Sequence, residues 1–144
     1  MLRFACLPFS ALTPSQLHDA LALRAAVFVV EQACIFQDVD GLDPHALHLL
    51  ADDGALAGYA RILPPGTRFD VTSIGRLVVA PRARGTGLGR QLVEEAIAAI
   101  ERHGRVPIAL SAQAHLERFY ASFGFLPGER YDEDGIPHVE MRRP

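Results

Sequence analysis

Apolar residues along this chain follow a period of two in some segments, as in strands, and a period of 3.6 in others, as in helices. The strand-like segments are residues 3–7, 48–51, 58–63, 71–79, 106–111 and the two arms of a hairpin within residues 125–142. The helix-like segments begin at Thr13, Leu88 and Leu116. This order predicts an α/β or α+β domain built around one mixed sheet.

Turn and capping residues support these boundaries. The run Thr13-Pro14-Ser15-Gln16 combines an N-cap, a proline at the first helical position and a capping-box glutamine. Asp52-Asp53-Gly54 and Asp134-Gly135 are typical of tight turns between antiparallel strands. Residues 31–45, EQACIFQDVDGLDPH, have no sustained period and are expected to form a long loop or a broken helix. Loops of this length inside a compact domain usually carry function.

Composition narrows the class of protein. The chain has 144 residues, which is the usual size of one domain, so residues 1–144 are expected to form a single domain. With 49% apolar residues and a formal charge of -3, it lacks the basic excess that nucleic-acid binding requires. The N-terminal residues contain neither a secretion signal nor a membrane span, so we expect a soluble cytoplasmic protein. Cys6 and Cys34 are too few for a disulfide framework.

The segment GTGLG lies between a predicted strand and a predicted helix. Glycines there let backbone N–H groups approach an anion, next to the positive end of the helix dipole. A Walker loop would end in Gly-Lys-Ser/Thr, whereas Gly89 is followed by Arg90 and Gln91. A dinucleotide site would need GxGxxG and an acid after the next strand, which ends instead in Ser111 and Gln113. The remaining pattern, RxxGxG, starts at Arg82.

This region resembles the acyl-CoA pyrophosphate loop of the GNAT acyltransferase superfamily. The pattern V-x-P-x-x-R-G-x-G-x-G is matched by Val79, Pro81, Arg84, Gly85, Gly87 and Gly89. A second segment, QAHLERFYASFGF, is similar to the family segment in which an Asn precedes a helix with Phe-Tyr and a final Gly-Phe, with Gln113 in place of the Asn. The segments LRAAVFVVEQACIFQDVDGLD and YDEDGIPHVEM are similar to the ElaA-type subfamily, so the resemblance covers nearly the whole chain.

The resemblance implies a fold and a donor site. The fold would be a mixed, mostly antiparallel sheet of about six to seven strands flanked by helices, with two splayed strands forming a cleft for coenzyme A. The donor would be acetyl-CoA, with no metal. The resemblance places the following residues at the donor: backbone groups of Leu77 and Val79, the loop residues Arg84, Gly85, Thr86, Gly87 and Gly89, then Arg90 and Gln113. Arg82 is a further candidate for a phosphate contact.

The resemblance also implies catalytic groups. Tyr120 stands where the family's usual general acid protonates the departing thiolate. Many relatives use a glutamate as base near the position of Ser73, which cannot take a proton in that way. Glu31 is therefore the first choice of base, with Asp38, Asp40, Glu140 or a chain of water as alternatives. His115 is a distant candidate for proton transfer.

The expected reaction moves an acetyl group from acetyl-CoA to a primary amine by direct attack in a ternary complex. The acceptor would be a small-molecule or peptide amine, and acidic residues of the long loop favour a cationic one. The alternative is a non-catalytic module that binds coenzyme A for regulation or interaction. The pairs His45/His48 and His138/Glu140 are not expected to bind metal, since two loose pairs arise by chance. Neither nucleic acid nor a membrane is an expected partner, and relatives of this kind are often homodimers.

Overall fold

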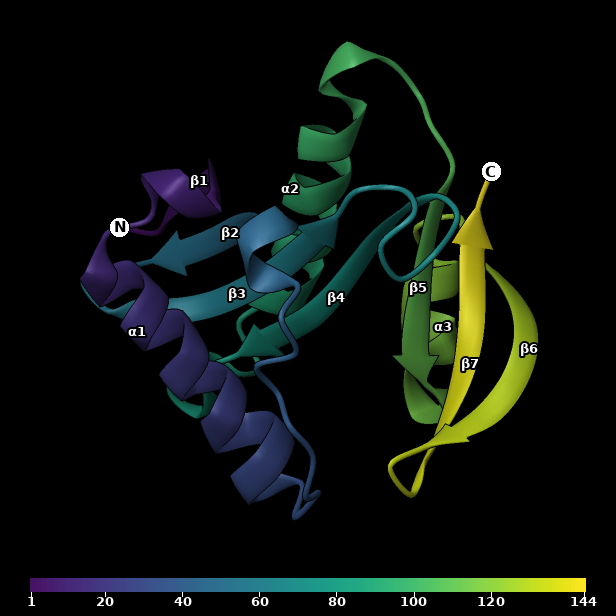
Figure 1. Ribbon diagram of the computed structural model, residues 1–144, viewed down its shortest axis with the longest axis horizontal. Coiled ribbons are helices and arrows are strands. Elements are labelled where there is room, and N and C mark those ends of the chain that lie inside the picture. The colour runs from purple at the N-terminus through teal and green to yellow at the C-terminus, as the bar shows by residue number, and fades with distance from the viewer.

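The computed structural model describes residues 1–144 and contains one seven-stranded sheet (Figure 1). The strands are β1 Arg3–Pro8, β2 Leu47–Asp52, β3 Leu56–Leu63, β4 Thr72–Val79, β5 Ile108–Gln113, β6 Leu126–Glu133 and β7 Ile136–Arg143. Their order in the sheet is β1-β2-β3-β4-β5-β7-β6. All neighbours are antiparallel except β4 and β5. The predicted mixed, mostly antiparallel sheet is confirmed.

Helices cover both faces of this sheet (Figure 1). The helices are α1 Pro14–Arg24, α2 Leu88–Ile100 and α3 Glu117–Ala121, and α1 continues as a wider π-type segment, Ala25–Glu31. Helix α1 packs on one face, where Ala20 and Val27 join Leu50, Tyr59 and Val78 in a small apolar cluster. Helices α2 and α3 pack on the other face, over the larger core.

Most predicted boundaries agree with the structure to within two residues. The capping box at Thr13 and Gln16 is formed by hydrogen bonds of 2.9 and 3.1 Å. The fifth strand starts at Ile108 rather than Val106, because Pro107 has no N–H to donate to a ladder. The final turn has φ of 53° at Asp134 and 82° at Gly135, as a two-residue hairpin turn with both angles positive requires.

Strands β4 and β5 separate soon after they meet. They pair only through Thr72 with Ile108 and Ser73 with Ala109, after which the two strands diverge (Figure 1). On its other side, β4 contains a bulge where Arg76 adopts a positive φ of 50°. An extra residue in one strand bends it and increases its twist. The bulge therefore carries the second half of β4 away from β5 and opens a cleft in the middle of the sheet.

Candidate active site

A cavity of ≈ 340 Å³ occupies the cleft between the diverging strands. Its walls include β4 from Ser73 to Val79 and β5 from Leu110 to Gln113. The end of the π-type segment, the loop between β3 and β4 and the β6–β7 hairpin also contribute residues. The cavity thus lies at the point where the sheet is interrupted, which is where a ligand can reach backbone groups that have no strand partner.

The exposed edge of β4 can be assigned from its hydrogen bonds. The Ala80 N–H donates to the carbonyl of Ala57 on β3 at 2.8 Å. Backbone groups of successive strand residues point to opposite sides, so Val78 also faces β3. Leu77 and Val79 consequently direct their N–H and C=O groups toward the cleft, where no strand pairs with them. This is the edge that the sequence motif indicated.

The glycine-rich loop leads from β4 into helix α2. Gly85 and Gly87 have φ of 77° and 83°, and Gly87 is the N-cap of α2. The N–H groups of Gly85, Thr86 and Gly87 have no hydrogen-bond partner in the chain, and the first N–H groups of α2 add to them. Thr86 instead uses its hydroxyl, which donates to the Ala83 carbonyl at 2.6 Å. Free N–H groups at a helix N-terminus form an anion-binding cradle.

The three arginines around this loop have different partners. Arg84 lines the cavity and donates to both carboxylate oxygens of Glu31, at 2.7 and 2.6 Å. Arg82 binds the turn between β2 and β3 through Asp53. Arg90 lies over the ring of Phe123 and donates to the Ser122 hydroxyl at 2.8 Å. Only Arg84 therefore has its side chain at the cavity.

Tyr120 lies on α3 with its ring buried against the sheet. The ring makes edge contacts with Phe119 and Phe125 at centroid distances of 5.1 and 6.2 Å. Its hydroxyl has no hydrogen-bond partner in the chain, although the residue lines the cavity. Burial raises the pKa of Tyr120 to about 12. The group is therefore a protonated donor throughout the physiological range of pH.

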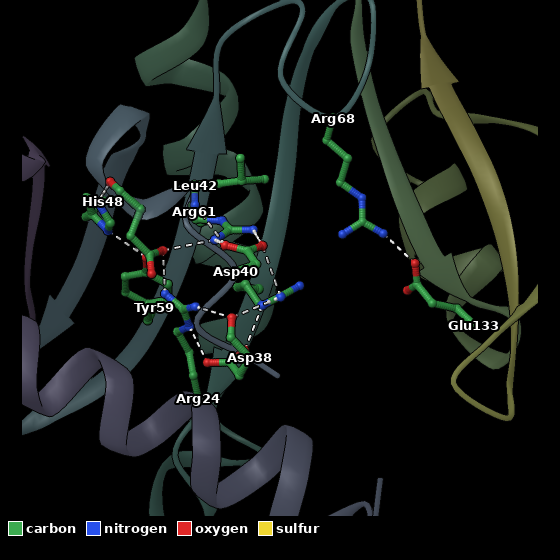
Figure 2. Close-up of polar contacts among 11 residues, drawn as sticks. Arg24, Asp38, Asp40, Leu42, His48, Tyr59, Arg61, Arg68 and Glu133 are labelled. Atoms are coloured by element: carbon green, nitrogen blue, oxygen red, sulfur yellow. Dashed lines mark hydrogen bonds and ion pairs between the residues drawn. The ribbon is translucent and has the colours of Figure 1, made fainter. Parts of the chain in front are cut away.

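Three contacts cross the cleft and join its two walls. Gln113 of β5 donates through its amide to the Gln32 side chain at 3.2 Å. The Cys34 thiol donates to the Asp134 carbonyl at 3.4 Å, and Arg68 pairs with Glu133 (Figure 2). The long loop and the β3–β4 loop are thereby tied to the final hairpin, and the hairpin end of the cavity is enclosed on two sides.

The acidic residues of the long loop lie elsewhere than predicted. Asp38, Asp40 and Asp43 form a network with Arg24, Arg61 and Arg76, most of it buried (Figure 2). The network has three positive and three negative charges, and none of the three aspartates lines the cavity. The prediction that these acids favour a cationic acceptor is therefore wrong, because arginines within the chain already neutralise them.

This network instead supports the shape of β4. Asp38 accepts a hydrogen bond from Arg76 at 2.7 Å, and Arg76 is the residue with positive φ at the bulge. Asp38 also binds Arg24 of α1 at 2.9 Å. The loop acids thus hold the bulge, and with it the diverging half of β4, against helix α1.

Glu31 and Glu140, the remaining acidic candidates for the base, are likewise paired with arginines. Neither Glu31 nor Glu140 lines the cavity. The hydrogen bonds from Arg84 hold the pKa of Glu31 below its ordinary value, and Glu140 is paired with Arg142 at 3.1 Å. For Glu31 to accept a proton from a substrate, its carboxylate would first have to leave Arg84.

Several ionisable groups that line the cavity were not predicted as site residues from the sequence. Among them are Arg68, Glu133 and His138, and Arg61 and Arg76 of the network also line the cavity. A signal was present, because the two-residue turn at Asp134-Gly135 fixes the register of the hairpin. In that register Glu133 and His138 lie on one face of the sheet, diagonally across the two strands.

Comparison with known proteins agrees with this geometry. Residues 16–143 match the model of the acetyltransferase (GNAT) domain family. The chain is 44% identical to the protein ElaA of Escherichia coli, covering 99% of this chain and 97% of that protein. The crystal structure of E. coli ElaA superposes with a TM-score of 0.92 at 43% identity, each chain being fully covered.

A second solved structure is an acyl-CoA N-acyltransferase from Pseudomonas aeruginosa. It is 46% identical, with a TM-score of 0.94 and 100% of both chains covered. None of the helices is long and apolar enough to cross a membrane. The family match, these ElaA-type relatives and the cleft at the glycine-rich loop together show that the chain belongs to the GNAT acetyltransferase family and is an acyltransferase enzyme.

Proposed function

We propose that this enzyme transfers an acetyl group from acetyl-CoA to a primary amine of a small molecule or peptide by direct attack in a ternary complex. One observation carries the proposal. A single cavity is lined by Leu77 and Val79 of the unpaired β4 edge, by Tyr120, whose hydroxyl has no partner in the chain, and by Arg84 of the anion cradle. A thioester donor needs such groups to bind its phosphates, to pair with its extended arm and to protonate its leaving thiolate.

Each part has a role in the proposed reaction. The N–H groups from Gly85 to Gly89, with the first turn of α2, bind the pyrophosphate, and Arg90 contributes its backbone rather than its side chain. Leu77 and Val79 pair with the pantetheine arm as an added strand would. The Leu77 N–H stabilises the oxyanion that forms when the amine attacks, and Tyr120 protonates the thiolate. Gln113 reaches coenzyme A through the amide that now contacts Gln32.

Release of free thiol from acetyl-CoA tests this function. The acceptors should include spermidine, glucosamine, a peptide with a free N-terminus and a peptide with an internal lysine. Acetyl transfer to at least one amine, with acetyl-CoA and amine both bound before the first product leaves, supports the proposal. Tight binding of acetyl-CoA without turnover on any amine would favour the alternative, a non-catalytic module that binds coenzyme A.

The Gly87→Ala variant should weaken acetyl-CoA binding. An alanine at φ of 83° costs roughly 1–2 kcal/mol, and relief of that strain rotates the N–H groups away from the cradle. We expect the Kd for acetyl-CoA to rise about tenfold by calorimetry. Gly54→Ala is the control, because Gly54 also has positive φ but lies in the remote β2–β3 turn. An equal loss of affinity in both variants would mean that strain alone, and not the cradle, is responsible.

The Glu31→Gln variant separates two roles of Glu31. Because both carboxylate oxygens bind Arg84, we expect loss of the charge to release the guanidinium for phosphate. The KM for acetyl-CoA should then fall a fewfold while kcat stays constant, as measured by steady-state kinetics. A fall in kcat on the order of 100-fold, with unchanged KM for acetyl-CoA, would instead identify Glu31 as the base.

A further inference from the structure

A compact polar cluster lies on the wall of the cavity formed by the β6–β7 hairpin. His138 is only 8% exposed, yet it lines the cavity. Its Nε2 atom is 3.4 Å from the Glu133 Oε2 atom, and the other oxygen of Glu133 is bound by Arg68 (Figure 2). The Tyr131 ring stacks on the imidazole at a centroid distance of 6.0 Å, and its hydroxyl is hydrogen-bonded to Ser111. The cluster therefore holds the imidazole in a fixed orientation.

The contacts of the ring determine where it can accept a proton. The Nδ1 atom is 2.7 Å from the Ile136 carbonyl, and a carbonyl only accepts, so Nδ1 carries hydrogen. In the neutral ring the lone pair is then on Nε2, beside the Glu133 carboxylate. When Nε2 takes a proton, the imidazolium has an acceptor for each N–H group, the Ile136 carbonyl and Glu133. Both ring nitrogens therefore have an oxygen acceptor within reach in the folded chain.

We propose that His138 is the general base of the acetyl transfer, with Glu133 and Arg68 as its positioning residues. This inference rests on the proposed function. The substrate ammonium donates one proton to Nε2 of His138, and the resulting amine forms a bond to the thioester carbon. As the carbon–sulfur bond breaks, the thiolate takes the hydroxyl proton of Tyr120. The second proton from nitrogen restores that hydroxyl, and His138 releases the first proton to solvent.

Charged groups line the same cavity as His138 from several elements, including Arg61 of β3 and Arg76 of β4. From β6, His138 faces Glu133 and Tyr131, and from the turn Asp134 lines the same cavity. The residue opposite it on β5, Gln113, is uncharged. Arg68 reaches it only through Glu133, while His115 and Tyr120 line the cavity from α3 and the turn before it. Glu133 is therefore the carboxylate placed to balance the imidazolium.

The His138→Gln variant tests the proposal with the amine that the wild type acetylates fastest. We expect kcat/KM for the amine to fall on the order of 100-fold near neutral pH. The wild-type rate should rise with pH and then level off once the base is deprotonated, whereas the variant should show no such plateau and should keep rising log-linearly as free amine accumulates. His18→Gln is the control, because His18 is 82% exposed on α1. A His138→Gln profile that levels off at the same pH as the wild type would overturn the proposal.

Glu133→Gln provides a second, isosteric test, since its amide oxygen can still accept from Arg68. Loss of the carboxylate removes the partner of the imidazolium, so the acid limb should move to lower pH while the Kd for acetyl-CoA is unchanged. An unmoved acid limb would show that Glu133 is merely structural and would contradict its proposed role. These outcomes differ from a failure of the proposed function, in which the wild type itself would acetylate none of the amines.

Discussion

Replacing Tyr120 with phenylalanine is expected to lower kcat on the order of 100-fold and to leave the Kd for acetyl-CoA unchanged. The variant keeps the ring that packs against Phe119 and Phe125 and removes only the hydroxyl. Since that hydroxyl has no partner in the chain, its removal leaves no buried group unsatisfied. The melting temperature should therefore stay the same or rise slightly. Steady-state kinetics, calorimetry and thermal unfolding measure the three quantities.

The choice of donor tests the role of Tyr120 as an acid. With p-nitrophenyl acetate the leaving group departs as a stable anion, so the difference between wild type and Tyr120→Phe should shrink to nearly nothing. A defect of equal size with both donors would show that Tyr120 acts by positioning rather than by proton donation. The pKa of Tyr120 is raised to about 12, so its hydroxyl stays protonated up to about pH 10. If the wild-type rate already falls as the pH rises toward 10, another group is responsible.

Asp43→Asn is expected to cause the largest loss of stability. One oxygen of Asp43 accepts hydrogen bonds from Arg24 at 2.7 Å and from Arg61 at 2.9 Å, and all three side chains are nearly fully buried. Without the carboxylate, the network has three positive charges and only two negative ones. Removing one partner of a buried ion pair costs about 3–5 kcal/mol. Urea unfolding of the variant measures this loss in the free energy of unfolding.

Asp53→Asn is the matched control for that prediction. Asp53 also binds an arginine through two hydrogen bonds, but it and Arg82 are substantially exposed. Water screens exposed ion pairs, so this variant should unfold at nearly the same urea concentration as the wild type. A comparable loss in both variants would mean that burial of the network contributes little.

The same network predicts how stability depends on pH. Burial alone would raise the pKa of Asp43, but hydrogen bonds from Arg24 and Arg61 outweigh it and hold the pKa below its ordinary value. The pKa of Asp40 is shifted in the same direction, since bonds from Arg61 and the Leu42 N–H outweigh its burial. The unfolded chain therefore binds more protons in acid. The stabilisation is complete above about pH 4, the unfolded value, and is lost progressively below it.

Several parts of the fold could be predicted because they depend on local chemistry. The capping box at Thr13, the turn at Asp134-Gly135 and the periodic face of α2 all formed as the sequence indicated. Helix caps, tight turns and amphipathic periods are set by residues within a few positions of one another. For the same reason the loop from Arg84 to Gly89 was recognisable from its residues alone.

The partners of the charged residues were not predictable in this way. The aspartates of the long loop looked available for a substrate, and only the folded chain places Arg24, Arg61 and Arg76 beside them. Glu31 is paired with Arg84, 53 positions away along the chain. Such pairs depend on how separate helices, strands and loops pack, and residue spacing along the sequence does not predict that packing.

The sequence by itself determined the glycine-rich loop at the start of α2, because a turn with positive φ at a helix N-terminus is a local structure. The tertiary structure alone decided the rest of the cavity. There the bulge at Arg76 opens the sheet, the buried network keeps the loop acids out of the cavity, and the last hairpin places Glu133 between His138 and Arg68. Those residues meet only because strands distant in sequence diverge around one cleft.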